Sequence, residues 1–232
     1  MSKENALHRL IFRSTLYNNS LKEKKIRNVS EIKISTLPGN KEIGNKIFQG
    51  NFSLSGYNLD LRDKLPWQIN APKLWKKDFH SFFWLHHLRA TDTFSASTFS
   101  QTILNRWINE YGQWDEFVWS IPLIALRLES WILNYDFIIF DAKEKFLNKF
   151  INSLFKQLKH FLIWNNLNDS SIDKIQIGLT LYLSGVFTGK KKLSQRGVRL
   201  VNNEIEKSSI NKNMFNCSNS SEVLIILRVL ST

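Results

Sequence analysis

The densest group of side chains that could carry chemistry lies in residues 78–89, where histidines alternate with aromatic and basic residues. His80, Trp84 and His87 are three and four residues apart, so they share one face if this segment is helical. A neutral histidine can remove a proton near neutral pH, a charged one can neutralise an anion, and Trp84 could stack on a sugar ring. The alternative is a hydrogen-bonded histidine in the core or at its rim. Metal binding is disfavoured, because no carboxylate other than Asp78 lies at ligand spacing.

A second group pairs a guanidinium with an indole. Arg127 and Trp131 are four residues apart, so Arg127 could bind the carboxylate or sulfate of a sugar while the Trp131 ring covers it. The alternative is structural: the stem of Arg127 packs on Trp131 and its head pairs with Glu129 or Asp115. From the residues alone, the structural alternative is favoured.

Net charge indicates an anionic partner without choosing its kind. The chain of 232 residues carries 32 Lys and Arg against 20 Asp and Glu, a net charge of +12. That balance suits nucleic acid, an acidic membrane surface or an acidic polysaccharide, and it also suits solvated Lys-rich helix faces. We find no phosphate-binding loop, nucleophile elbow, Ser/His/Asp order or nucleic-acid motif, so no nucleic-acid partner is expected.

Cysteine content and hydropathy exclude other classes. Cys217 is the single cysteine, so the sequence predicts no internal disulfide, no zinc site and no bound metal or cofactor. No apolar run approaches the roughly 20 residues of a transmembrane helix. The N-terminus lacks the pattern of a signal peptide, and a cytoplasmic location is therefore expected.

The elements that must position these groups are helices. From residue 72 onward apolar side chains recur with a period near 3.6. Successive stripes predict helices over residues 74–85, 99–108, 117–132, 146–162, 172–187, 193–210 and 220–230. Short links between them favour antiparallel helical hairpins, and periodicity alone leaves a bundle, a solenoid and a toroid open.

The residues before this helical region have another character. Residues 1–43 are predicted to form a basic extension with at most one short helix, built on Leu7, Leu10, Ile11 and Leu16. A frayed tail and contact with a membrane surface are its alternatives. Residues 44–71 are predicted to form an extended arm or hairpin, because Ile47–Gly56 alternates apolar and polar side chains and contains two glycines. Residues 72–232 make up the helical domain.

Several segments also follow one another in the order and spacing of a known family. They are Ile47–Gly56, Trp75–Ala90, Trp107-Ile108 with Trp114, Arg127–Trp131 and Phe155–Leu162. Together they resemble the N-terminal region of heparinase II/III-like proteins of the α-proteobacterial type, over about residues 44–232. The resemblance implies an all-α fold of antiparallel hairpins that form a partial α/α toroid, preceded by a short extended arm or β-hairpin.

The same resemblance implies a chemistry. Such proteins bind an acidic polysaccharide in a cleft between the toroid and a C-terminal β-sandwich. There a side-chain base removes the C5 proton of a uronate, a neighbouring group neutralises the carboxylate, and the 4-O-linked sugar leaves. We therefore predict His80 and Arg127 as catalytic residues. Predicted substrate contacts are Trp84, His87, Trp131 and Asn219.

Departures from the family pattern shape the predicted function. Asp169-Ser170-Ser171 stands where relatives carry an Asn-containing segment, and residues 212–220 keep only Asn219 of the family's loop D-G-G-H-x-x-R-N-P. The chain reaches Thr232 without a β-sandwich. The predicted function is a polysaccharide lyase domain, complete only with the missing β-sandwich domain. The alternatives are a non-catalytic domain that binds acidic glycans, and a helical scaffold for protein or nucleic acid.

Overall fold

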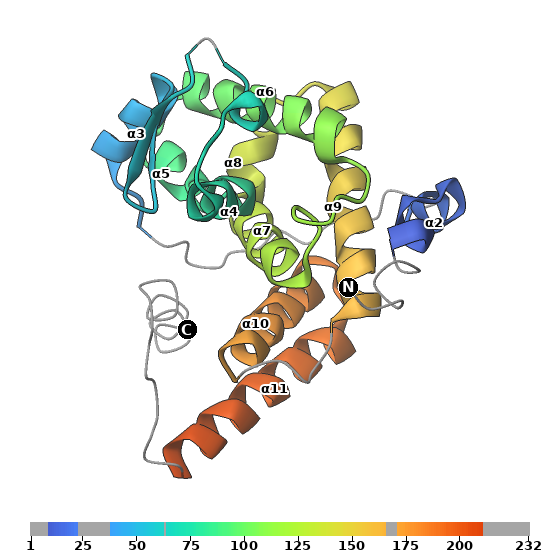
Figure 1. The fold of residues 1–232 in the computed structure, drawn as a ribbon. Coiled ribbons are helices and arrows are strands. Elements are labelled where there is room, and N and C mark those ends of the chain that lie inside the picture. Colours follow the sequence, from blue (N-terminus) through green and yellow to red (C-terminus); the bar gives the residue numbers. More distant parts are fainter. Residues whose placement is uncertain (1–8, 23–37, 63, 166–170, 211–232) are drawn as a thin grey trace. The chain divides into compact units, whose positions relative to one another are not determined.

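The computed structural model describes residues 9–22, 38–62, 64–165 and 171–210 of the chain (Figure 1). These residues fall into two compact units that divide after Phe161. Helices dominate both units, as the sequence predicts. The expected boundaries at residues 43 and 71 stay predictions, and the helix expected over 220–230 lies outside the described residues.

In the first unit, residues 9–13 are helical and α2 (Thr15–Ser20) follows. The Ser14 side chain caps α2 by accepting a hydrogen bond from the Tyr17 backbone N–H at 3.1 Å. The Tyr17 hydroxyl lies 2.6 Å from His160 Nδ1, which ties this short segment to α9 (Glu144–Trp164). The prediction of which apolar side chains form the packed face of this segment is wrong in part. Leu10 and Leu16 are 72% and 83% exposed, while Phe12 and Leu21 are buried.

The extended arm is a true hairpin, but it starts later than expected. Lys41–Phe48 forms α3, capped by Asn40, so Ile47 and Phe48 are helical and do not belong to the arm. Strands β1 (Asn51–Leu54) and β2 (Tyr57–Asp60) then pair antiparallel, with Phe52 opposite Leu59. Ser55 and Gly56 both have positive φ, which suits the two-residue turn of a right-twisted hairpin. Pro66–Gln68 forms a 3-10 turn, η1.

The helical part of this unit repeats one plan. A kinked helix is followed by a tight turn and a long helix: α4 (Lys73–Ser81), α5 (Leu85–Arg89) and α6 (Phe94–Tyr111), then α7 (Ile121–Leu133), α8 (Tyr135–Ile139) and α9. The long helices begin about fifty residues apart. Asp92 and Asp141 occupy matching turns, each with a φ of 52°. The chain therefore forms successive helical hairpins, and α4 packs on α7 and α6 on α8.

A kink divides the helix that periodicity predicts as continuous over residues 74–85. Phe82 adopts a left-handed conformation with φ 58°, which ends α4 before α5 begins. The Phe82 ring is fully buried, and its carbonyl accepts a hydrogen bond from the Ser130 hydroxyl of α7 at 2.6 Å. Core packing therefore holds a residue in a conformation that its type disfavours.

Aromatic rings fill the core between the hairpin and the helices. Phe52 of β1 contacts Phe79 and Trp84 edge-on, with ring centroids 5.6 and 5.1 Å apart. Trp75 stacks on Phe79 at 5.2 Å and donates from Nε1 to the Phe52 carbonyl at 3.3 Å. Trp107 and Trp131 meet edge-on at 5.5 Å and continue this core toward α9. The β-hairpin is thereby fixed against α4.

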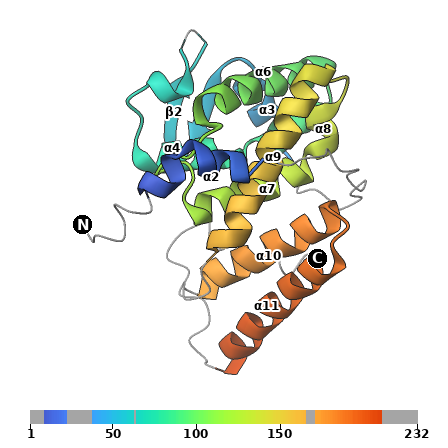
Figure 2. The same cartoon turned by 90° about the vertical axis from the view of Figure 1, so that its right-hand side faces the viewer.

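The second unit contains the hairpin of α10 (Ser171–Phe187) and α11 (Lys191–Ile210), whose helices lie side by side in both views (Figures 1 and 2). The bounds of these two helices agree with the helices predicted from periodicity over residues 172–187 and 193–210. A Cβ on Gly197 would stand 2.5 Å from the Gly178 carbonyl oxygen, and one on Gly185 would stand 2.3 Å from Ser194 N. Glycine at these positions lets the two backbones approach closely.

Candidate functional site

The predicted catalytic residues meet in a buried polar centre made by α4, α7 and α9. Arg127 of α7 donates from Nη1 to the His80 carbonyl at 3.0 Å and from Nη2 to the Val118 carbonyl at 2.9 Å. Its Nε donates to Gln157 Oε1 at 2.5 Å, and its guanidinium lies 4.7 Å from the ring centre of Trp107. Arg127 therefore ties together the two kinked helices, the loop after α6 and α9.

Burial sets the protonation states of this centre. It lowers the pKa of His80 to about 3, with further lowering from the charges of Arg127 and Lys76. His80 is thus neutral near neutral pH, and its Nδ1 accepts a hydrogen bond from Trp107 Nε1 at 3.0 Å, so the proton sits on Nε2. Burial also lowers the pKa of Arg127 to about 9. Within the described residues, no carboxylate forms an ion pair with Arg127.

Solvent hardly reaches these two residues. His80 is 4% exposed and Arg127 is 0% exposed. The Tyr111 ring stands edge-on to the His80 ring at 4.9 Å, and Phe117 does so at 6.0 Å. The structure brings the predicted pair together, but it uses Arg127 to bind backbone carbonyls. The catalytic assignment stays a prediction, and it would require the aromatic cover over His80 to open.

The predicted substrate contacts lie in separate places. Trp84 is 2% exposed and donates from Nε1 to the Phe79 carbonyl at 3.1 Å. Trp131 is fully buried, and its Nε1 has no hydrogen-bond partner among the described residues. Both rings are enclosed by the core, so their role in stacking on sugar stays a prediction that would need the core to open.

His87 and Asn219 complete the predicted set. His87 of α5 is half-buried, and its Nδ1 accepts from the backbone N–H of Asn40, the residue that caps α3, at 3.0 Å. Burial lowers the pKa of His87 to about 4, and the adjacent His86 adds to the effect. Asn219 lies outside the described residues. Within the part of the chain that is described, no cluster of His, Cys, Asp and Glu could hold a metal ion.

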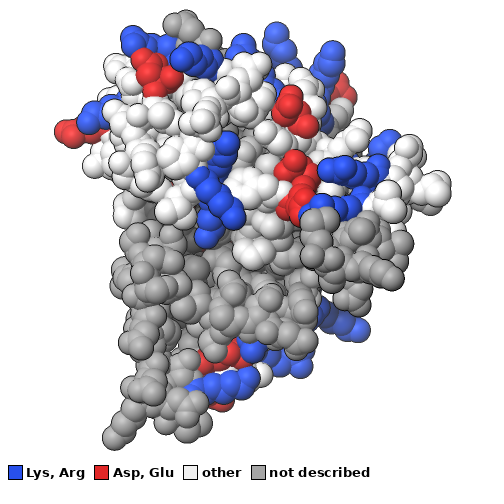
Figure 3. All heavy atoms as spheres, viewed as in Figure 1, with Lys and Arg blue, Asp and Glu red and all other residues white. Residues whose placement is uncertain are grey.

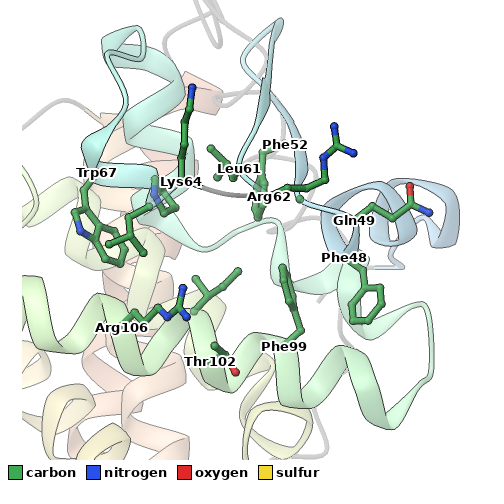
Figure 4. A pocket seen from close by; sticks show the side chains of 14 residues that line it. Phe48, Gln49, Phe52, Leu61, Arg62, Lys64, Trp67, Phe99, Thr102 and Arg106 are labelled. Carbon is green, nitrogen blue, oxygen red and sulfur yellow. The ribbon is translucent and has the colours of Figure 1, made fainter.

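An accessible pocket lies elsewhere in the same unit, between the β-hairpin, the 61–67 segment and α6 (Figure 4). We call it the cation–aromatic pocket. Its volume is about 230 Å³. It is lined by Phe48, Gln49, Gly50, Phe52, Leu61, Arg62, Lys64, Leu65, Pro66, Trp67, Phe99, Thr102, Ile103 and Arg106.

Three cations surround this pocket, and they differ in their partners. Arg62 donates from Nε to both Asp60 carboxylate oxygens, at 3.0 and 2.9 Å, so its charge is partly neutralised. Lys64 and Arg106 are exposed and form no ion pair within the described residues. Figure 4 shows Arg106 extending from α6 toward the 61–67 segment, near Trp67. Among the described residues, two cations without an ion pair therefore line the same pocket as an aromatic ring.

An aromatic path connects the pocket to the buried polar centre. The Trp67 ring meets the Tyr111 ring edge-on at 6.0 Å, and Tyr111 in turn covers His80. Burial raises the pKa of Tyr111 to about 12, with further raising from Asp115 and Glu110. Its hydroxyl therefore stays protonated and can act only as a neutral hydrogen-bonding group near neutral pH.

Sequence reasoning missed the pocket residues. Lys64, Trp67 and Arg106 come from a loop, a 3-10 turn and a helix, and no local spacing links them. The one usable signal was Trp67 itself, a large aromatic residue in a proline-bracketed loop.

On the face seen in Figure 3, Lys and Arg side chains stand apart over uncharged surface, and acidic side chains lie close to several of them.

Comparison with known proteins places the fold in a class. The structure is similar to the crystal structure of a mutant of the heparan sulfate lyase HepC from Pedobacter heparinus, with a TM-score of 0.57 and 17% sequence identity. The match covers 88% of this chain and 35% of HepC, so the chain spans about a third of that enzyme. No protein-family model matches the sequence, and no curated protein matches it.

This similarity confirms the predicted fold. The chain has the all-α, hairpin-built architecture of the α/α toroid in heparinases, together with a small antiparallel β-hairpin. At this identity the likeness extends to the fold alone. Within the described residues, no helix is both long and apolar enough to cross a membrane.

Proposed function

We propose that this chain is the helical domain of a polysaccharide lyase-type protein, of the heparinase II/III-like family, and that it binds an acidic polysaccharide at the cation–aromatic pocket. The observation that carries the proposal is the exposed Arg106, which forms no ion pair within the described residues and lines the same pocket as Trp67, on a fold of the heparinase type. The net charge of +12 favours the same class of ligand.

The pocket matches the chemistry of an acidic sugar. A guanidinium can hold a carboxylate or sulfate with two parallel hydrogen bonds, which an ammonium group does not match in geometry. The indole of Trp67 supplies an apolar surface for the ring carbons. Pockets for drug-sized ligands run from about 300 to 1,000 Å³. This pocket, at about 230 Å³, suits one sugar ring of a longer chain that continues into solvent.

A second candidate is lyase activity itself, supported by the neutral His80, whose backbone carbonyl accepts a hydrogen bond from Arg127. A neutral imidazole can accept the C5 proton of a uronate, and a neighbouring cation would stabilise the carboxylate as its charge grows. The bond from C4 to the linking oxygen would then break, the departing sugar would take up a proton from water on that oxygen, and a C4=C5 double bond would remain in the uronate. Both residues are enclosed, and Trp107 Nε1 donates to Nδ1, the one nitrogen of neutral His80 that could accept a proton. This candidate therefore requires that the Tyr111 cover moves aside and that the Trp107 hydrogen bond breaks.

The test is a binding measurement with heparin as the acidic probe and dextran as the neutral one. Isothermal titration at low salt should show heparin binding and no dextran binding. Arg106→Gln should weaken heparin binding by about 1.5–3 kcal/mol, because a charge-assisted hydrogen bond is lost. Lys41→Gln is the matched control, since Lys41 is exposed and outside the pocket.

Two results would count against the proposal. Equal heparin affinity in the native chain and in Arg106→Gln would remove the pocket from the binding site, and equal affinity for heparin and dextran would remove the role of charge. The same samples should be followed by ultraviolet absorbance of the unsaturated uronate. A rise that disappears in His80→Ala would establish the second candidate, whereas binding with no rise would leave the domain as a binding module.

A further inference from the structure

The exposed face of α11 carries a row of cations. Lys192, Arg196 and Arg199 follow at helical spacings of four and three residues, so they share one side of the helix, and all three are exposed. Val201 and Glu204 on the opposite side are buried. The hairpin with α10 thus turns one face of α11 inward and presents the basic face to solvent.

This face lacks the acidic residues that normally accompany surface lysines. No Asp or Glu occurs between Lys190 and Asn203. Arg196 donates to Asn165 Oδ1 at 3.4 Å, and Arg199 donates from Nε to the carbonyl of its neighbour Gln195 at 3.3 Å. Within the described residues neither forms an ion pair. Solvated helix faces usually mix both signs, because like charges on one face repel.

The position of Lys191 and Lys192 in α11 is a second unfavourable feature of this charge arrangement. Cations are favourable near the C-terminus of a helix. In the structure α10 ends at Phe187, and Lys191 and Lys192 form the first turn of α11. Cations at a helix N-terminus meet the positive end of the helix dipole. Folding alone therefore gains nothing from this arrangement of charge, and an anionic ligand would relieve it.

We propose that this basic face of α11 is a second contact for acidic polysaccharide, separate from the cation–aromatic pocket. The proposal rests on the proposed function for the identity of the polyanion. The face offers charge without aromatic side chains, since α11 contains no Phe, Trp or Tyr. Stacking on bases, which single-stranded nucleic acid uses, has no partner here. A polysaccharide that carries carboxylate or sulfate groups along its length needs only charge contacts at this place.

The experiment compares long heparin with a heparin disaccharide. The test variant combines Lys192→Gln, Arg196→Gln and Arg199→Gln. The control variant combines Lys41→Gln, Lys143→Gln and Lys145→Gln, three exposed lysines next to an acidic residue in sequence. Both variants lose the same charge, and circular dichroism with thermal melting checks that both fold. Affinity is measured by titration at several salt concentrations.

We expect the test variant to bind long heparin at least about tenfold more weakly, with a salt dependence shallower by up to about three, one for each lost contact. Disaccharide affinity should stay unchanged in this variant, since the disaccharide fills the pocket alone. Equal affinity of the test and control variants for long heparin would overturn the inference. Loss of duplex DNA binding with heparin binding intact would also overturn it, in favour of a nucleic-acid contact.

The two proposals fail in different ways. Arg106→Gln without effect, combined with a strong effect of the α11 variant, would refute the pocket and keep the α11 contact. The opposite pattern would refute only the α11 contact. A native chain that binds no heparin at low salt would refute both.

Discussion

Gln157 gives the sharpest test of the buried polar centre. It is fully buried on α9, and its Oε1 accepts the hydrogen bond from Arg127 Nε at 2.5 Å. Gln157→Leu keeps a side chain of similar size but leaves that donor of a buried cation without an acceptor. A buried donor without a partner costs about 1–3 kcal/mol, and more when it is charged. We therefore expect a loss of about 3 kcal/mol in the free energy of unfolding.

Gln157→Glu should act in the opposite direction at the same position. A carboxylate would give Arg127 a counterion inside the core, and a buried charge is far less costly when paired. We expect Gln157→Glu to be at least about 2 kcal/mol more stable than Gln157→Leu. It should also move the pKa of Arg127 up from its lowered value of about 9.

Urea denaturation followed by tryptophan fluorescence measures both variants, because Trp107 lies directly against the Arg127 guanidinium. A change of about 3 kcal/mol corresponds to a melting temperature lower by roughly 6–12 °C for a chain of this size. If Gln157→Leu and Gln157→Glu were equally stable, the centre would not depend on charge. Our account of Arg127 as a buried cation held by its acceptors would then be wrong.

Further predictions concern pH, close packing and the N-terminal segment. The pKa values of His80 and His160 are about 3 and 4 when folded, against 6.5 for an ordinary histidine, so the unfolded chain binds more protons between these values. Stability should therefore fall as pH falls from about 6.5 toward 3, by on the order of a few kcal/mol, in urea titrations at several pH values; a flat profile would contradict this. Gly44→Ala should lower the melting temperature far more than Gly56→Ala, because a Cβ on Gly44 would stand 2.1 Å from a backbone carbonyl oxygen of α5 whereas one on Gly56 meets open space. Equal losses would show that positive φ at Gly56, not the clash at Gly44, dominates. Tyr17→Phe should remove the contact with His160 and cost about 1 kcal/mol, seen as faster limited proteolysis at the N-terminal arginines; unchanged cleavage would show that apolar packing alone holds α2.

Helix type and approximate extent followed from the sequence, because a period near 3.6 records which side chains face a core. The stripes over 146–162 and 172–187 match α9 and α10 closely. The break inside the apolar stripe over residues 74–85 could not be predicted from the sequence. The left-handed Phe82 obeys no local preference and is held by burial and by Ser130 on a distant helix. The short α3 escaped for another reason: it spans eight residues with Gly44 near its middle, and its last residues, Ile47 and Phe48, were assigned to the extended arm.

The candidate site shows the same division between what the sequence predicts and what only the tertiary structure decides. The sequence indicated His80 and Arg127 in two separate groups, and in the structure Arg127 donates to the His80 backbone carbonyl. The sequence could not show that His80 and Arg127 are enclosed, because their burial depends on the side chains that α6 and α9 place over them. The exposed pocket depends on Lys64, Trp67 and Arg106, which meet only after the β-hairpin docks against α6.

The sequence by itself therefore determined the helical class, the positive charge and the groups capable of chemistry, since all three are properties of residue type and local spacing. The tertiary structure decided which of those groups reach solvent. Arg127 and Trp131 lie four residues apart on one helix face, as expected, but that face is the one that α9 covers, so both are sealed in the core. Arg106 and Trp67 have no relation in sequence, and docking of separate segments leaves them together at the surface.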